Sequence, residues 1–452
     1  MFCNSPIKEI IFYRETNLFY LMNLPAIMFI LVLFAILMAF FSQQKFDYFP
    51  IALIIGAIAV VSMITFGGVS EEEIVGFINF NALIFIFAMQ IIIYFATYNR
   101  VLDYVAIKLI HITKGNNRLF FYMICLFTGT VVAFIEDLTL SLLLVPLIFR
   151  TCRVLEIPAG SYMMGMTITI NIGAILTPVS SLKNLIIGEE FGWGFGEYLA
   201  NMGILYLITL IPTIFLMDWF IIRKEEQATE KNKNMLLSLL DPGIVIENKL
   251  YFLTTVIVIL ASFALMILGF NPALVTLVAA AVFLLIHSKK TNFSNLKNEI
   301  EWKIIIVFAI LFILSNSLSF FGLSELISTG IVSVVNDNIF LAVLITLGLS
   351  SLMSAFLAGT PVTIILLPIF SAIVGKGFFP NPIIIAFIGG VNMAGNFLPQ
   401  GSACDLLTLS LAKKNKVVNL DYNRLLKNGS IFATMHFFLI LGYTMIYTLI
   451  LM

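Results

Sequence analysis

The sequence has few charged residues for its length. Of 452 residues, only 11% are Asp, Glu, Lys or Arg, whereas 60% are hydrophobic. A water-soluble protein of this size needs a charged surface, usually about a quarter of its residues. Apolar segments of about twenty residues, the length that crosses about 30 Å of hydrocarbon, recur from Leu18 onward. The composition therefore excludes a soluble fold and predicts an all-α polytopic membrane protein whose first partner is the lipid bilayer.

Groups that bind metals or react with substrates are also scarce. The three histidines lie far apart, and the four cysteines contain no CxxC pair, so neither a zinc site nor a disulfide framework is expected. No basic segment is interleaved with aromatic residues, so nucleic acid is not an expected partner. No nucleophile–base set is recognisable. We therefore expect neither an enzyme nor a bound cofactor.

The hydropathy pattern predicts about ten membrane-spanning helices and two further apolar stretches that are interrupted. The helices are expected near residues 19–41, 50–66, 81–98, 159–177, 199–222, 250–269, 272–287, 303–321, 381–398 and 430–451. Stretch 118–149 is interrupted by Glu136 and Asp137, and stretch 339–374 by residues 358–361. The second arm of the first stretch, residues 138–149, would extend only about 18 Å. Both stretches are therefore predicted to be re-entrant hairpins.

The charges between the helices predict their orientation. Lys and Arg are concentrated in alternate loops, while Glu71-Glu72-Glu73 and other acidic groups occupy the loops between them. Basic loops face the cytoplasm. The rule predicts a multi-pass protein of the cell (inner) membrane with both termini outside, although Lys8 and Arg14 in the N-terminal tail disagree.

The sequence is internally duplicated. Residues 133–146 match residues 355–368 at an offset of 222, and Asn171 and Pro178 match Asn392 and Pro399 at an offset of 221. Five crossings and one hairpin per copy would make the two copies inverted, an architecture typical of secondary transporters. We therefore divide the chain into an N-terminal tail (1–18), a first repeat (19–222), a cytoplasmic linker (223–249) and a second repeat (250–452).

Polar clusters interrupt the apolar sequence at a hairpin tip and a helix break in each copy. Pro and Gly should unwind the helices near Pro178 and Gly401, and unwound backbone at membrane depth persists only where protein or a polar cavity satisfies it. Charged groups there are costly and therefore candidates for function, although a structural ion pair is the alternative. The candidates are Glu136, Asp137, Thr139, Asn171, Thr177, Pro178, Ser180, Ser181, Lys183 and Asn184 in the first copy, and Thr360, Thr363, Asn392, Asn396, Gly401, Ser402 and Asp405 in the second.

At these clusters the sequence resembles the ion transporter superfamily, especially its arsenite efflux permeases and the melanosomal P protein. Residues 133–146 resemble the hairpin of that branch, and the segments beginning at Thr177 and Pro399 resemble its two helix breaks. The resemblance implies a secondary transporter in which each tip and broken helix together hold a cation. Carried over, it implies a Na⁺ site near Asp137, Thr139, Ser181 and Asn184, and it also implies that a homodimer can form.

The sequence departs from that family in three places. Glu136 and Asp137 make the first tip more acidic than the neutral Ser-Asn-Thr pattern of the dicarboxylate carriers. The second tip has no Asn or Asp, and Lys183 stands where relatives have a small residue or Pro. The lysine could pair with a carboxylate, attract an anion or substitute for a coupling cation. We expect a transporter of a small anion coupled to Na⁺ or H⁺. The alternatives are a cation/proton antiporter that uses Glu136 and Asp137, and a channel.

Overall fold

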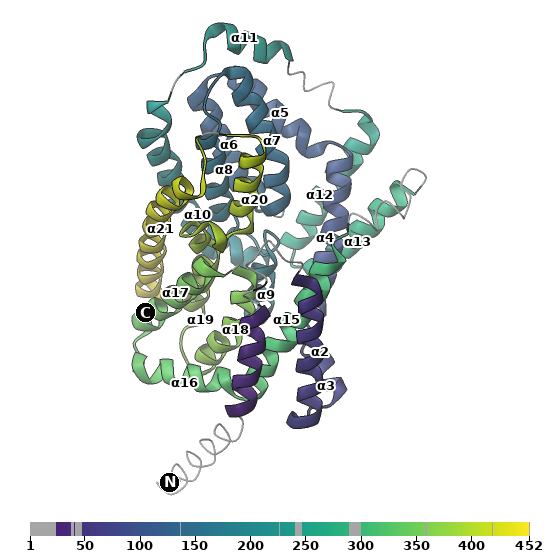
Figure 1. Cartoon of the computed structure of the whole chain (residues 1–452), viewed down its shortest axis with the longest axis vertical. Coiled ribbons are helices and arrows are strands. Elements are labelled where there is room, and N and C mark those ends of the chain that lie inside the picture. The colour runs from purple at the N-terminus through teal and green to yellow at the C-terminus, as the bar shows by residue number, and fades with distance from the viewer. Residues whose placement is uncertain are drawn as a thin grey trace, which may run out of the picture. The chain divides into compact units, whose positions relative to one another are not determined.

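A computed structural model describes residues 24–37, 40, 48–135, 137–225, 227–239, 246–288, 300–357, 359–417 and 419–451. Within these ranges all regular structure is helical (Figure 1). The predicted all-α class is therefore confirmed.

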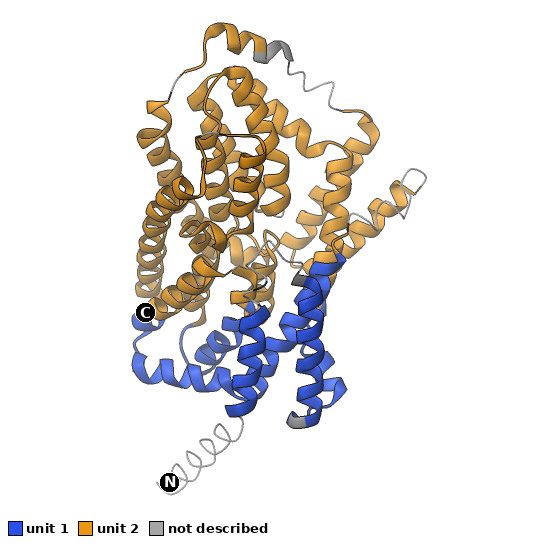
Figure 2. Cartoon of the chain, in the orientation of Figure 1, with its two compact units in different colours: residues 1–80, 302–342, 364–379 blue, residues 81–301, 343–363, 380–452 orange. Residues whose placement is uncertain are grey.

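The chain forms two compact units, which Figure 2 shows in different colours. Unit 1 comprises residues 1–80, 302–342 and 364–379, and unit 2 comprises residues 81–301, 343–363 and 380–452. Each unit takes segments from both predicted repeats. The compact units are thus a different division of the chain from the repeats, whose boundaries remain a prediction.

Unit 1 is built around the packing of α2 against α15. Its described helices are Leu24–Leu37, α2 (Tyr48–Gly67), α3 (Glu71–Gly76), α15 (Trp302–Phe320) and α16 (Leu323–Val335). Gly56 of α2 allows Ile310 of α15 to come close, because a Cβ at this position would lie 2.9 Å from the Ile310 side chain. Ser317 Oγ also donates to Met63 Sδ at 2.7 Å.

Unit 2 contains most of the other helices, including those of the first predicted hairpin. They are α4 (Phe80–Tyr98), α5 (Val101–Thr113), α6 (Asn117–Val131), α7 (Asp137–Leu155), α8 (Gly160–Gly173), α9 (Leu182–Phe191), α10 (Phe195–Phe220), η1 (Ile222–Lys224), α11 (Glu230–Leu239), α12 (Lys249–Ile267), α13 (Pro272–Ile286), α19 (Pro380–Met393), η2 (Ala394–Asn396), η3 (Pro399–Gly401), α20 (Ala403–Lys414) and α21 (Tyr422–Leu451). Helices α17 (Ile339–Phe356) and α18 (Gly359–Gly375) have residues in both units.

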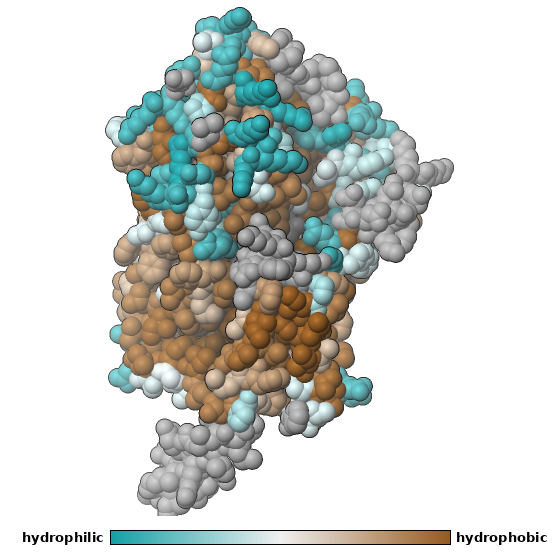
Figure 3. Space-filling model, viewed as in Figure 1, coloured by the Kyte–Doolittle hydropathy of each residue, from teal (hydrophilic) through white to brown (hydrophobic). Residues whose placement is uncertain are grey.

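Helices α8 and α19 form the centre of unit 2. Every residue from Gly160 to Gly173 is buried, as is every residue from Pro382 to Met393. A helix that is apolar on all sides belongs inside a bundle. Outside it, α10, α12 and α21 expose large apolar side chains such as Ile211, Leu260 and Phe438. In Figure 3 hydrophilic residues gather over α11, whereas hydrophobic residues cover the C-terminal part of α21, as expected of a lipid-facing surface.

The described helices differ from several of the predicted spans. Seven of them are long and apolar enough to cross a membrane: α4, α7, α10 with η1, α12, α15, α17 and α21. Predicted spans 159–177 and 381–398 are shorter helices, since α8 ends at Gly173 and α19 at Met393. Span 272–287 is also shorter, because α13 has 15 residues.

The predicted length of the first hairpin's second arm was wrong. Helix α7 has 19 residues and continues to Leu155 instead of ending at residue 149. Arg153 lies in its last turn. A cation there interacts favourably with the helix dipole, so Arg150 and Arg153 do not end the helix. The argument for re-entrance from a short arm therefore fails, and re-entrance itself stays a prediction.

Two segments predicted as loops are helices. Helix α5 begins at Val101 and ends at Thr113, while α16 begins at Leu323 and ends at Val335, an offset of 222 at both ends. The same offset separates the first residues of α4 and α15, of α6 and α17, and of α7 and α18. The sequence duplication thus corresponds to a repeated series of elements.

Candidate substrate and ion site

The first helix break separates α8 from α9 and contains Pro178, as predicted. Its free carbonyl groups are satisfied by side chains of the break itself. Asn184 Nδ2 donates to Ala174 O at 2.5 Å and to Thr177 O at 3.1 Å, and Ser180 Oγ donates to Thr177 O at 2.7 Å. Thr177 Oγ1 donates to Ala133 O, at the end of the first hairpin arm, at 2.5 Å. These bonds hold the break against the hairpin without exposing unpaired carbonyls.

The second break lies between α19 and α20 and contains η2, η3 and Gly401. A Cβ at Gly401 would lie 2.5 Å from Ser354 O and 2.8 Å from Ala355 O, which are backbone atoms near the end of α17. Ser402 then begins α20, and its Oγ accepts from Asp405 N at 3.4 Å. Glycine is therefore needed at 401 for the second hairpin to contact the second break.

Each copy's buried asparagine bonds to the short helix of the other copy. Asn171 of α8 donates to Asp405 Oδ1 of α20 at 3.3 Å and to Asn396 Oδ1 at 2.8 Å, and it accepts from Ser402 Oγ at 3.1 Å. Asn392 of α19 donates to Asn184 Oδ1 of α9 at 2.8 Å. The two breaks therefore form one hydrogen-bonded cluster.

Asp405 is the acidic member of this cluster. It is 1% exposed, and its Oδ1 accepts from Thr167 Oγ1 at 2.5 Å as well as from Asn171. No salt bridge to Asp405 occurs in the described part of the chain. A buried carboxylate is costly without a compensating cation, so this position suits a proton or a bound metal cation.

The first hairpin tip lies beside the start of α20, which packs against α7 and α8 (Figure 1). Half-buried Asp137 begins α7, and its Oδ1 accepts from Leu138 N at 2.8 Å. Ser141, one turn further on, contacts Cys404 Sγ at 2.7 Å. Thr139 is half-buried on the same turn, while Glu136 lies outside the described residues.

The second tip lies beside the start of α9. Gly359 is the first residue of α18, and a Cβ there would lie 3.2 Å from Lys183 Nζ and 2.8 Å from Val391 O. Buried Thr363 donates to Gly359 O at 2.9 Å, and Thr360 is half-buried. The Lys183 side chain therefore occupies the space into which a side chain at 359 would project.

Three buried polar atoms of the cluster have no hydrogen-bond partner among the described residues: Ser181 Oγ, Asn392 Oδ1 and Asn396 Nδ2. Buried polar groups are nearly always paired. These atoms are therefore the ones available to a substrate or a coupling ion.

The predicted Na⁺ set is not joined into one group by hydrogen bonds between the described residues. Asp137 bonds within α7, whereas Asn184 bonds to Ser180 and Asn392. Sequence reasoning also missed Thr167, Ser141 and Cys404. Thr167 could have been found, since it lies four residues before Asn171 and therefore shares its helix face.

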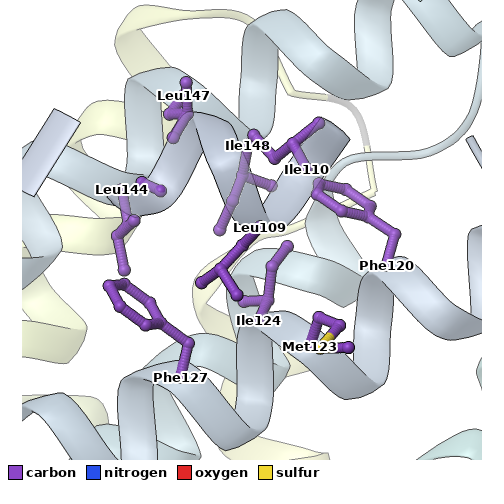
Figure 4. Close-up of a pocket in the computed structure, with 10 residues that line it drawn as sticks. Leu109, Ile110, Phe120, Met123, Ile124, Phe127, Leu144, Leu147 and Ile148 are labelled. Atoms are coloured by element: carbon purple, nitrogen blue, oxygen red, sulfur yellow. The ribbon is translucent and has the colours of Figure 1, made fainter. Parts of the chain in front are cut away.

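A pocket between α5, α6 and α7 has a different character (Figure 4). Its lining residues are all apolar, among them Leu109, Phe127 and Leu144. It offers no polar group to an anion, so it is not part of the candidate site.

A family model described as "Citrate transporter" matches residues 37–390. The chain belongs to the citrate transporter family. Among its relatives, the 46 kDa membrane protein of Mycobacterium leprae is 24% identical over 345 residues, which are 74% of this chain and 79% of the relative. An uncharacterized transporter of Synechocystis is 21% identical over 438 residues, 90% of this chain and 94% of the relative. The human P protein is 27% identical over 179 residues, which cover 37% of this chain and 21% of that protein.

Two solved transporter structures share the fold of this citrate transporter family member. The YdaH transporter of Alcanivorax borkumensis matches 93% of the chain, and 97% of its own, with a TM-score of 0.59 at 12% identity. MtrF of Neisseria gonorrhoeae, described as one of a class of antimetabolite efflux pumps, matches 92% of the chain and 94% of its own, with a TM-score of 0.58 at 10% identity. The predicted resemblance to the ion transporter superfamily is confirmed, and the chain is a multi-pass membrane transporter.

Proposed function

We propose that this family member is a secondary active transporter that moves a small anion across the cell membrane by alternating access, coupled to Na⁺ or H⁺. The anion is a carboxylate or an inorganic or metalloid oxyanion. The observation that carries the proposal is the polar cluster shared by the two helix breaks. Its unpartnered atoms, Ser181 Oγ, Asn392 Oδ1 and Asn396 Nδ2, include both donors and acceptors in an otherwise apolar interior.

The electrostatics of the cluster favour an anionic substrate. Helices α9 and α20 both begin at it, and α18 and α7 begin next to Lys183 and Cys404 respectively. A helix N-terminus carries a partial positive charge and unpaired N–H groups, which attract anions. Lys183 adds a full positive charge. Asp137 and Asp405 supply carboxylates for the coupling cation.

A panel of anions tests this proposal on the purified chain. Citrate, a dicarboxylate, sulfate and arsenite are added in turn, and thermal stability is measured, because a ligand of the folded state raises it. The anion that stabilises the protein should then enter proteoliposomes against its gradient when a Na⁺ or H⁺ gradient is imposed. A folded protein that responds to no anion in either assay would contradict the proposal.

A cation/proton antiporter is the second candidate, and Asp405 is the observation in its favour. This buried carboxylate has no described cationic partner, and Asp137 lies close enough to interact with it electrostatically. An antiporter would change the internal pH of proteoliposomes when Na⁺ or K⁺ is added without any anionic substrate. An anion symporter would not.

The remaining assignments extend the proposal. We place the protein in the cell (inner) membrane with both termini outside, where the positive-inside rule places them. We assign no catalytic residue and no cofactor other than the coupling ion. A homodimer is the oligomer that the superfamily resemblance suggests.

A further inference from the structure

The two hairpin tips occupy equivalent sequence positions, but the first begins with an acidic residue, whereas the second begins with a glycine and lies beside a lysine. Asp137 begins α7 and corresponds, at the offset of 222, to Gly359 at the start of α18. Cys404, beside the first tip, corresponds to Lys183, beside the second. The first tip thus has an acidic residue and is contacted by a thiol at Ser141, whereas the second tip has a glycine beside an ammonium group.

A backbone oxygen lies in the same region as the ammonium. Lys183 Nζ and Val391 O lie 3.2 and 2.8 Å from the same point beside Gly359. Val391 O accepts one hydrogen bond, from Ser354 Oγ at 3.0 Å, and a carbonyl oxygen has two lone pairs. Asn392, the next residue, has an unpartnered Oδ1 and bonds to Asn184, which follows Lys183 in α9. Backbone carbonyl and amide oxygens are ligands that hard cations prefer.

Lys183 forms no salt bridge with a carboxylate of the described residues, and Asp137 affects it only through a longer-range attraction. The charge therefore does not serve a structural ion pair among those residues. A cation at membrane depth requires compensation by oxygen dipoles or by an anion.

We propose that Lys183 is a tethered cation that stands at the second hairpin tip in place of a coupling cation, so that only the first tip exchanges a cation with the solution. The ammonium supplies the positive charge that neutralises the anionic substrate. This inference rests on the proposed function, because it assigns a role within the same site.

Sodium binding to the purified full-length chain tests the inference without any substrate. Lys183→Met removes the charge while keeping a long apolar side chain, and Val391 O and the unpartnered Asn392 Oδ1 should then be available to Na⁺. We expect the variant to bind one more ²²Na⁺ per chain than the wild type. We also expect a saturable rise in thermal stability in sodium chloride, relative to choline chloride at equal ionic strength, that the wild type lacks.

Two controls accompany this variant. Lys183→Arg keeps a cation at the tip and should gain no sodium response. Lys249→Met removes a charge from the exposed start of α12 and should respond to sodium as the wild type does. Equal sodium stoichiometry in Lys183→Met and the wild type would overturn the inference.

To separate a sodium requirement for folding from sodium binding, Lys183→Met and Lys183→Gln are purified in parallel, with and without sodium. Recovery of folded protein only in sodium supports a tethered cation. If Lys183→Met and Lys183→Gln both fail to fold, with sodium as well as without it, while Lys183→Arg folds, the inference is refuted. None of these outcomes depends on which anion is transported, so a failure of the anion panel is distinguishable from a failure of this inference.

Discussion

Asn171 and Asn392 show how single residues join the two copies. Each is almost fully buried, and each extends its amide to the short helix that belongs to the other copy. An amide both donates and accepts, so it can bond across the interface, and in Asn392 the Oδ1 atom is left without a partner among the described residues. The sequence predicted both residues as candidates, but not the partners that they bond to.

Asp405→Asn is the residue-scale prediction. The substitution keeps the size of the side chain and an oxygen that can accept from Thr167 Oγ1, so folding should change little. Because the neutral amide can neither take up a proton nor compensate a metal cation, the dependence of transport or thermal stability on the coupling ion should fall at least tenfold.

Thermal stability measured across Na⁺ concentration and pH checks this prediction. Thr167→Val is the matched variant, because it removes the hydrogen bond and leaves the carboxylate. Its coupling-ion dependence should be weakened but present. An Asp405→Asn protein with wild-type ion dependence would place the coupling ion elsewhere.

At the scale of elements, the broken helices were predicted but their continuations were not. Pro178 and Gly401 marked the breaks because proline lacks a donor and glycine permits close approach. Hydropathy could not show that α9 and α20 continue as separate short helices, since their ends are polar. It also could not show that α7 extends to Leu155, because Arg150 and Arg153 resemble the start of a loop.

Gly401→Ala should be destabilising because its Cβ would lie 2.5 and 2.8 Å from two backbone carbonyl oxygens of α17, which cannot rotate away. We expect a loss of about 1–3 kcal/mol. The measurement is thermal or denaturant unfolding of the purified protein.

Gly442→Ala in α21 is the matched control. No atom lies within 4 Å of a Cβ at this position, so the substitution should be neutral or stabilising by up to about 1 kcal/mol. If both alanine variants behaved alike, contact between the second hairpin and the second break would not limit stability.

At the scale of the whole molecule, a polar network ties three distant segments of unit 2 together. Glu225, just after α10, accepts from Ser161 of α8 and pairs with Arg424 of α21 at 3.6 Å. Its side chain is 12% exposed. Burial raises the pKa of Glu225 above its ordinary value of 4.5, and the bonds from Ser161 and Arg424 only partly oppose this.

The raised pKa fixes the sign of a pH effect. Folded Glu225 binds its proton more tightly than the unfolded chain does, so its contribution to stability increases as pH falls through the folded pKa and is complete near 4.5. The melting temperature of the wild type relative to Glu225→Gln should therefore rise as the pH is lowered from neutral toward 4.5. A difference that stays constant or falls over this range would contradict the assignment.

The predicted orientation is also a property of the whole molecule. A cysteine placed at Glu72 should react with an impermeant maleimide added outside intact cells. A cysteine at Lys114 should react only after the membrane is permeabilised, because the positive-inside rule places its loop in the cytoplasm. The reverse pattern would invert the topology, and reaction of both from outside would contradict the alternation of loops. The native Cys125, Cys152 and Cys404 are buried and should label weakly, while Cys3, in the tail predicted outside, is first replaced by serine.

The sequence by itself determined that this protein is helical, lies in a membrane, is duplicated and has polar breaks. These properties depend on local composition and on spacing along the chain. Only the tertiary structure decided which polar groups meet: Asn171 with Asp405, Asn392 with Asn184, and Lys183 with the bare tip at Gly359. Such pairs lie 176 to 234 residues apart, and packing, rather than periodicity, brings them together. The two tips, alike in sequence position, differ in charge because the first begins with Asp137, whereas the second begins with Gly359 and lies beside Lys183 of the other copy.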